Sequence, residues 1–372
     1  RYTICINVRN DASNRFGEHT NNRFYPVWST GVRWDMHQEK WFPAKPWLNA
    51  STLRVSYGKQ GNVVANVSPK TLVSHVPSDP ITNESYLQLE QLPNPDLKWE
   101  KTFSWNVGID LSLFRNNMEI SFDYYKKETS DIVVEKKIPI ENGFRKMYIN
   151  SGAIDSEGYE LQVKLSPLST RDWSWTVNFT AAYMKDILKR SYTDEPALER
   201  FTNGNAALDG FPVSAFWSLP FIGLSPKNGS PLFAVMDQVG GEMQKVSGSL
   251  LDYLVYSGDS EPRVSGGIST TVRYKRFTLN AMFNYQLGHY KRLNPFITSS
   301  NNGMLSIPGA DMNASTELLA RWQQPGDETH TRIPALSTRD EDVSQYLPDN
   351  SLSLGNYDTV YRYSLYNRST ER

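Results

Sequence analysis

The sequence predicts an all-β protein, an antiparallel transmembrane β-barrel, on three grounds: alternating apolar and polar residues, long alternating runs, and connections of very uneven length. In residues 103–111, for example, Phe103, Trp105 and Val107 alternate with Ser104 and Asn106. Successive side chains of a strand point to opposite faces, so this run has one apolar and one polar face. No stretch of about 18 apolar residues occurs, which excludes a transmembrane helix. It does not exclude a barrel, whose strands only alternate.

The same alternation recurs along the whole chain. It is found in residues 2–8, 53–57, 103–111, 118–124, 159–165, 173–183, 268–274 and 277–287, and less regularly in 28–34. Ordinary strands have about 5–6 residues, whereas a tilted strand that crosses a membrane needs about 9–11. Several runs have the longer length, and 173–183 shows it most clearly. A soluble β-rich carbohydrate-binding protein also alternates, so this pattern alone leaves that alternative open.

The connections between the runs separate the two alternatives better. Short turns occur at residues 114–117, 166–172 and 275–276, and long loops at about 61–96, 128–156, 186–262 and 290–356. If the short turns are placed on one side of a membrane, every long loop falls on the other side. Outer-membrane barrels have this asymmetry, so we expect short periplasmic turns and long extracellular loops. The connection 35–49 is longer than expected for a periplasmic turn.

The side chains of the runs predict which face meets lipid. Phe179, Ile109, Leu279 and Phe283 are expected to face lipid, and Asn178, Asn280, Asn284 and Glu160 to face the interior. Tryptophans near the strand ends are expected to form interfacial girdles; a tryptophan-rich sandwich core is the alternative. The predicted girdle residues are Trp28, Trp34, Trp99, Trp105, Trp173 and Trp175.

The composition argues against several other functions. With 39 Lys+Arg against 40 Asp+Glu, the chain has no basic excess that would favour nucleic-acid binding. A single cysteine, Cys5, allows neither a disulfide within the chain nor a cysteine-based zinc site. The five histidines are isolated and no nucleophile elbow or phosphate loop occurs. We therefore expect no catalytic, cofactor-binding or metal-binding residues, and no enzyme activity.

Several segments, in order, resemble SusC-like TonB-dependent transporters, the outer-membrane nutrient importers of the Bacteroidetes. The resemblance spans nearly the whole chain. It is carried by Arg54-Val55-Ser56-Tyr57-Gly58, Asn94-Pro95-Asp96-Leu97-Lys98-Trp99-Glu100, Asp123-Tyr124-Tyr125, Asn150-Ser151-Gly152, Gly158-Tyr159-Glu160-Leu161, Arg321-Trp322-Gln323-Gln324-Pro325-Gly326-Asp327 and residues 363–372.

The resemblance implies that residues 1–372 form part of a 22-stranded barrel in the outer membrane, with the plug domain and TonB box absent from this chain. It implies TonB-dependent uptake of an oligosaccharide or oligopeptide. The implied partners are a SusD-like surface lipoprotein, and TonB with its inner-membrane motor through the missing N-terminal part. A passive porin, a surface-adhesion barrel and the soluble carbohydrate-binding protein remain alternatives.

The long loops are expected to make the contacts with substrate or lipoprotein, because a rigid scaffold leaves loops free to vary. Five aromatic residues in the loop 186–262 are candidates for these contacts; the alternative for Trp217 and Phe221 is packing against the barrel rim. They are Phe216, Trp217, Phe221, Tyr253 and Tyr256. Residues 314–323 predict a short loop helix that packs through Leu318, Leu319 and Trp322.

Overall fold

The computed structural model describes residues 1–13, 24–42, 45–65, 67–78, 81–139, 141, 146–191, 207–218, 221–227, 229, 231–233, 236–239, 242–245, 255–290, 298–299, 305–306 and 315–335. Two compact units make up the chain. The first, here called the sheet unit, comprises Arg1–Asp194, Leu208–Val213 and Pro262–Gly288. The second, the loop unit, comprises Glu195–Ala207, Ser214–Glu261 and His289–Arg372. Among the described residues no helix is long and apolar enough to cross a membrane.

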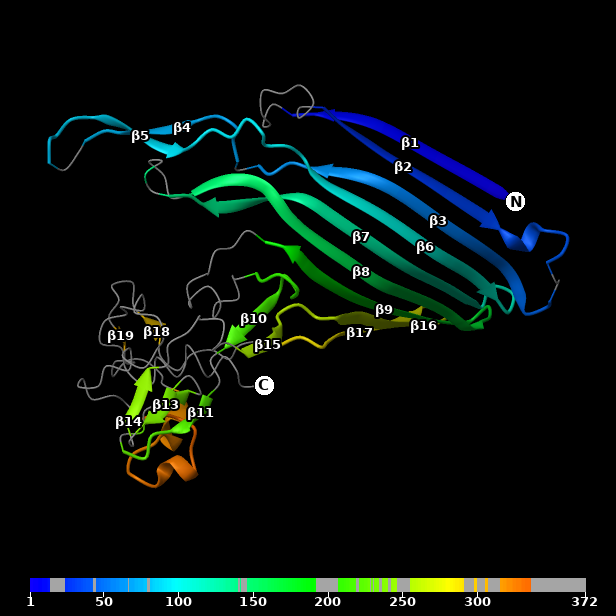
Figure 1. The fold of residues 1–372 in the computed structure, drawn as a ribbon. Coiled ribbons are helices and arrows are strands. Elements are labelled where there is room, and N and C mark those ends of the chain that lie inside the picture. Colours follow the sequence, from blue (N-terminus) through cyan, green and yellow to red (C-terminus); the bar gives the residue numbers. More distant parts are fainter. Residues whose placement is uncertain are drawn as a thin grey trace. The chain divides into compact units, whose positions relative to one another are not determined.

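The sheet unit is built on one antiparallel sheet of nine strands, which Figure 1 shows as a single curved layer. Its strands, in their order across the sheet, are β1 (Tyr2–Ala12), β2 (Phe24–Asp35), β3 (Leu48–Asn62), β6 (Glu100–Leu113), β7 (Met118–Lys137), β8 (Lys146–Ser169), β9 (Trp173–Arg190), β16 (Val264–Tyr274) and β17 (Phe277–Leu287). The described sheet is open, with β1 and β17 as its edges. This confirms the all-β, antiparallel prediction.

The register gives the sheet one apolar and one polar face. One cross-strand row runs through Ile4, Val32, Val55, Val107, Tyr124, Tyr159, Tyr183, Val264 and Leu287. The row one residue further along β2 runs through Thr3, Arg33, Arg54, Gly108, Asp123, Glu160, Ala182, Ser265 and Gln286. Because the side-chain period of a strand is two, these rows point to opposite faces. Phe179 and Phe283 lie on the apolar face, and Asn178 and Asn284 on the polar face, as their alternation predicts.

The connections leave the sheet at two distinct ends. Strands β6 and β7 are joined by residues 114–117, β8 and β9 by 170–172, and β16 and β17 by 275–276. We call this the short-turn end. The connection 36–47, which holds the 3-10 helix η1 (Met36–Gln38), also lies there. At the opposite, long-loop end, residues 63–99 connect β3 to β6, residues 138–145 connect β7 to β8, and residues 191–263 connect β9 to β16.

One predicted loop is mostly strand. Residues 128–156 were expected to be a long loop, but β7 and β8 remain paired up to Lys137 and Lys146. The pairing shifts between Thr129 and Ile132, where Asp131 has a φ of 58°. Such a bulge interrupts the period-two pattern, so the continuing strands cannot be read from alternation alone.

The long loop 63–99 is fixed to the sheet by what we call the clasp, residues 94–100. Leu97 is 1% exposed and packs with Tyr25, Val67 and Trp99. Asn150 of β8 accepts a hydrogen bond from the Lys98 backbone N–H at 2.9 Å, and its side-chain amide donates to the Lys98 carbonyl at 2.8 Å. Beyond the clasp the loop forms an exposed hairpin of β4 (Leu72–Val76) and β5 (Tyr86–Gln91).

The loop unit contains short paired strands. They are β10 (Ala215–Ser218) with β15 (Val255–Asp259), β11 (Phe221–Leu224) with β12 (Pro231–Phe233), β13 (Met236–Val239) with β14 (Glu242–Lys245), and β18 (Thr298–Ser299) with β19 (Leu305–Ser306). It also holds the 3-10 helices η4 (Thr316–Ala320) and η5 (Asp327–Thr329). Much of the predicted loop 290–356 lies outside the described residues.

The predicted loop helix is shorter than expected and packs through only part of its apolar stripe. It is the 3-10 helix η4, and Ala314 lies outside the described residues. Trp322 is 8% exposed, as predicted, but Leu319 is 76% exposed. The reason is that η4 ends at Ala320, after which the backbone is extended and the Trp322 N–H donates to the Ile333 carbonyl at 2.8 Å. The side chain of Trp322 also donates to Glu328 at 3.0 Å, and this hydrogen bond lowers the pKa of the Glu328 carboxyl.

Candidate functional site

The polar face of the sheet is the candidate functional surface, because it is hollowed and carries the hydrogen-bonding side chains. The described residues line three concavities along it. The largest, about 760 Å³, is lined by residues of β1, β2 and β3 such as Asn7, Ser29 and Ser56. Concavities of about 360 Å³ and 300 Å³ follow, the first beside Asp110 and the second beside Glu160. A solute moving along this face would meet polar groups throughout.

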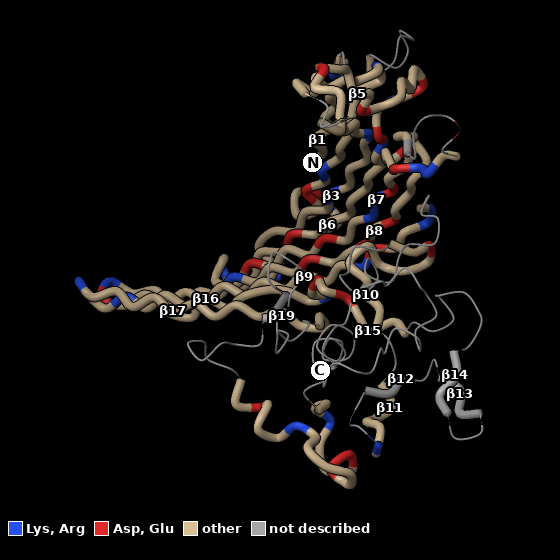
Figure 2. The backbone as a smooth tube through the Cα atoms, turned by 90° about the vertical axis from the view of Figure 1, so that its left-hand side faces the viewer, with Lys and Arg blue, Asp and Glu red and all other residues tan. Residues whose placement is uncertain are grey.

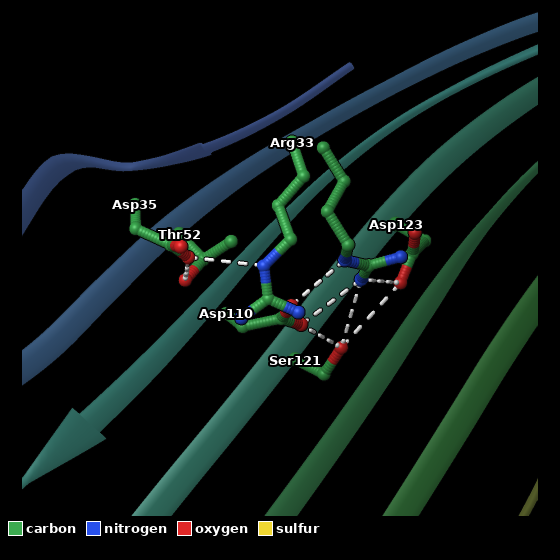
Figure 3. A network of polar contacts seen from close by, with 7 residues as sticks. Arg33, Asp35, Thr52, Asp110, Ser121 and Asp123 are labelled. Carbon is green, nitrogen blue, oxygen red and sulfur yellow. Dashed lines mark hydrogen bonds and ion pairs between the residues drawn. The ribbon is translucent and has the colours of Figure 1, made fainter. Parts of the chain in front are cut away.

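An ion-paired cluster lies in the middle of this face. The Arg54 guanidinium donates to Asp110 through Nε at 2.7 Å and through Nη2 at 2.9 Å. The same Nη2 donates to Asp123 at 2.9 Å, and Ser121 donates to Asp110 at 2.7 Å. Figure 3 shows Asp110, Ser121 and Asp123 converging from neighbouring strands. Two-point Arg–carboxylate pairs are geometrically specific, so this cluster fixes the side chains of β3, β6 and β7 relative to one another.

A glycine makes the central ion pair fit. Gly108 lies between Arg54 and Asp123 in the cross-strand row. A Cβ atom at Gly108 would lie 2.8 Å from Arg54 Nη2 and would contact a carboxylate oxygen of Asp123. The Arg54 side chain therefore crosses β6 through the space that glycine leaves.

A second pair continues the cluster towards β2. Arg33 donates to Asp35 at 3.0 Å, and the Thr52 hydroxyl donates to the same carboxylate oxygen at 3.0 Å (Figure 3). Glu119 and Lys164 pair at 3.2 Å on the neighbouring strands β7 and β8. The charged groups of β2 to β8 thus largely satisfy one another.

The sequence did not single out this cluster as a unit. Arg54 and Asp123 stand in segments that carry the family resemblance, and Glu160, Glu119 and Asp123 fall on the polar phase of their strands. Their meeting depends on the register between β3, β6 and β7, which alternation within each strand does not contain. The sequence signal that could have indicated that the Arg54 side chain crosses β6 is a glycine, Gly108, on the polar phase of that strand.

The predicted loop contacts are only partly described. Trp217 is 7% exposed and packs edge-to-face on Tyr256 at 5.8 Å, so it is buried rather than open to a ligand. The Tyr256 hydroxyl donates to the buried Asp259 at 2.5 Å. The pairing of β10 with β15 explains this burial. Phe221 is half-buried beneath the Arg332 guanidinium at 5.6 Å. Tyr253 and the side chain of Phe216 lie outside the described residues.

The predicted girdle residues fall in two belts on the apolar face, with one exception. At the short-turn end the ring centroids of Trp173 and Tyr274 are 4.3 Å apart, and Trp175 follows two residues along the same strand. Trp34 stacks on Tyr2 there, with ring centroids 5.9 Å apart. Towards the long-loop end Trp28 packs on Tyr57 at 5.4 Å, and Trp105 on Tyr124 at 5.1 Å.

Trp99 is the exception. It is 6% exposed and stacks on Tyr25 inside the clasp, with their ring centroids 5.5 Å apart. The neighbouring loop segment covers it, so the girdle proposed below omits it.

No group of three or more His, Cys, Asp or Glu side chains in the described part of the chain is arranged to hold a metal ion. The geometry of the polar face suits reversible hydrogen bonding to a solute.

Known proteins with a similar sequence are TonB-dependent receptors. TonB-dependent receptor P3 of Formosa agariphila is 23% identical over 94% of this chain and 36% of its own length. TonB-dependent receptor SusC of Bacteroides thetaiotaomicron is 25% identical over 86% of this chain and 33% of its own length. Both organisms are Bacteroidetes, as the resemblance implied. The chain spans about a third of the length of these two relatives.

Solved structures agree with the sequence relatives. The RagAB peptide importer in its "open-open" state matches with a TM-score of 0.72 and 26% identity, over 91% of this chain and 36% of that one. The "closed-closed" state matches with a TM-score of 0.71 and 25% identity, over 94% of this chain and 36% of that one. This chain therefore has the fold of a part of these importers.

The family assignment follows from the sheet, its two faces and these relatives together. Residues 1–300 match the family described as TonB dependent receptor-like, beta-barrel, a family of outer-membrane receptors and transporters rather than of enzymes. The chain belongs to the TonB-dependent receptor β-barrel family and is an outer-membrane protein.

Proposed function

We propose that this chain supplies part of the wall and the outer loops of an importer that takes up oligosaccharides or oligopeptides with energy delivered through TonB. The observation that carries this proposal is the division of one nine-stranded sheet into an exposed apolar face and a hollowed polar face. A bilayer accepts strands only in a closed barrel, with the apolar side chains outside. The polar face then lines the interior that a solute crosses.

The two aromatic belts support an orientation in the membrane. Aromatic girdles mark both interfaces of a barrel. Beyond the belt near the long-loop end the apolar face becomes charged, with Lys126 and Glu128 paired at 2.7 Å. Strands β7 and β8 continue beyond this belt and remain paired with each other up to Lys137 and Lys146. We assign this end to the cell exterior and the short turns to the periplasm.

The partners follow from the relatives. We propose that a SusD-like lipoprotein docks on the long loops, and that a plug domain inside the barrel makes the contact with TonB. RagAB is named a peptide importer, and that name describes RagAB. For this chain the family match supports both partners without fixing the substrate.

Deletion of the gene in its host tests the proposal. Cells are given fluorescently labelled pools of oligosaccharides and of oligopeptides, with and without a proton uncoupler. We expect energised uptake of one pool in the parent and its loss in the deletion strain, restored by the gene. Uptake that persists with the uncoupler would indicate a passive porin, and surface binding without uptake would indicate an adhesion barrel.

A further inference from the structure

The polar face changes character along the sheet. Between its ends, the face formed by β9, β16 and β17 bears only neutral side chains. They are Thr176, Asn178, Thr180 and Ala182, then Ser265, Gly267, Ser269 and Thr271, then Thr278, Asn280, Met282, Asn284 and Gln286. Figure 2 shows the charged residues of β16 and β17 gathered at the end that carries their shared turn. We call this surface the neutral wall.

The other part of the same face is charged, and most of its charged side chains are paired with one another; Glu160 lies beside the smallest concavity. Arg54 is committed to Asp110 and Asp123, Arg33 to Asp35, and Lys164 to Glu119. A solute that binds there must compete with existing ion pairs. The neutral wall carries no such pairs, so its hydrogen-bonding groups are the ones available to a solute.

The neutral wall has a notch at Gly267. The Gly267 N–H donates to the Thr180 hydroxyl oxygen at 3.1 Å. A Cβ atom at Gly267 would lie 2.8 Å from Asn284 Oδ1 and 3.8 Å from Thr180 Oγ1, so both groups border the space that the glycine leaves. Two residues further along β16, on the same face, Ser269 accepts a hydrogen bond from the Asn178 side chain at 3.3 Å.

The carboxamides of β17 are available for binding. Within the described residues, the side-chain amides of Asn280, Asn284 and Gln286 have no hydrogen-bond partner. A carboxamide offers donors and an acceptor together, and a hydroxyl does the same. Such a surface can exchange hydrogen bonds with a chain of hydroxyl groups.

We propose that the neutral wall, centred on the notch at Gly267, is the contact surface for an uncharged oligosaccharide. The inference rests on the proposed import function and narrows its substrate class. A free oligopeptide carries an ammonium and a carboxylate at its ends, and an acidic glycan carries carboxylates. Their charges would lose hydration along a wall that supplies no opposite charge, whereas the hydroxyl groups of a neutral glycan can exchange hydrogen bonds with water for hydrogen bonds with the wall.

The test compares two asparagines on the same face. Asn284 borders the notch, and Asn106 lies on β6 within the charged part. The oligosaccharide pool is separated by ion exchange into neutral and acidic fractions and is given to the host beside the oligopeptide pool. We expect energised uptake of the neutral fraction, reduced about tenfold by Asn284→Lys and less than about twofold by Asn106→Lys, at equal surface levels of the variants.

The outcomes separate this inference from the import function. Energised uptake confined to the acidic or peptide pool would overturn the assignment of the neutral wall to an uncharged oligosaccharide and would leave the import function standing. Equal loss in both lysine variants would overturn the location of the contact. Absence of energised uptake from every pool would overturn the import function, and the inference with it.

A binding measurement needs no transport. In a Cys5→Ser background, which removes the exposed native thiol, Asn284→Cys and Asn106→Cys are labelled with a small neutral maleimide. The neutral oligosaccharide fraction should slow labelling at position 284 and leave position 106 unchanged. An unchanged rate at position 284 would contradict the proposal.

Discussion

Single residues show how the polar face is assembled. Arg54 reaches two carboxylates from one strand because Gly108 leaves its path open. The charges themselves were visible in the sequence, but the crossing was not, since it requires the register of three strands. Local packing also buries Trp99, which its place near a strand end predicted as a girdle residue, and Trp217, for which the sequence left both ligand contact and packing open.

Alanine at Gly108 tests the crossing. The new Cβ atom must displace the Arg54 side chain, so we expect Gly108→Ala to lower the free energy of unfolding by about 1–3 kcal/mol, as overpacking does. Gly31 on the same face is the matched control, because a Cβ atom there would lie 3.8 Å from the Val55 carbonyl oxygen, at ordinary van der Waals distance. Gly31→Ala should stay within about 0.5 kcal/mol. Urea unfolding of the purified protein in detergent measures both, and equal effects would refute the crossing.

At the scale of elements, alternation predicted the strands of the sheet and the face of each side chain. It failed where the period is interrupted, at the Asp131 bulge that hides the continuation of β7 and β8. It also could not predict the clasp. The clasp depends on hydrogen bonds between Lys98 and Asn150, which are far apart in the sequence.

An arginine at Phe179 tests which face of β9 meets lipid. Near the bilayer midplane this substitution should cost about 2–4 kcal/mol, because a lipid-facing charge loses its hydration. Asn178→Arg, one residue earlier and on the polar face, should cost far less. Folding titrations into lipid vesicles compare the two variants. A larger cost at position 178 would invert the assignment of the faces.

Truncation of Leu97 tests the clasp. Leu97 is 1% exposed, so Leu97→Ala should destabilise the clasp by about 2–5 kcal/mol. The loop 63–99 should then be cut faster by trypsin added to whole cells. Leu87 in the hairpin beyond the clasp is 67% exposed, and Leu87→Ala should leave the cleavage rate unchanged. Equal rates in the two variants would show that the clasp does not hold the loop.

For the whole molecule, the sequence predicted the fold class, the two faces and the family, because these follow from local alternation and from short motifs. The composition of the polar face as a surface emerged only from the structure. Neutral positions of β9, β16 and β17 become one wall when the register aligns them. The ion pairs in the charged part of the polar face likewise join residues of different strands, so they could not be predicted from any one strand.

In the membrane, we expect the apolar face of the molecule to contact lipid and its polar face to line an aqueous interior. Spin labels at Phe179 and Leu279, and at Asn178 and Asn280, test it most directly in the protein reconstituted into bilayers after Cys5→Ser. We expect collision with oxygen dissolved in lipid at positions 179 and 279, and collision with a water-soluble nickel complex at 178 and 280. Water contact at 179 and 279, with lipid contact at 178 and 280, would contradict it.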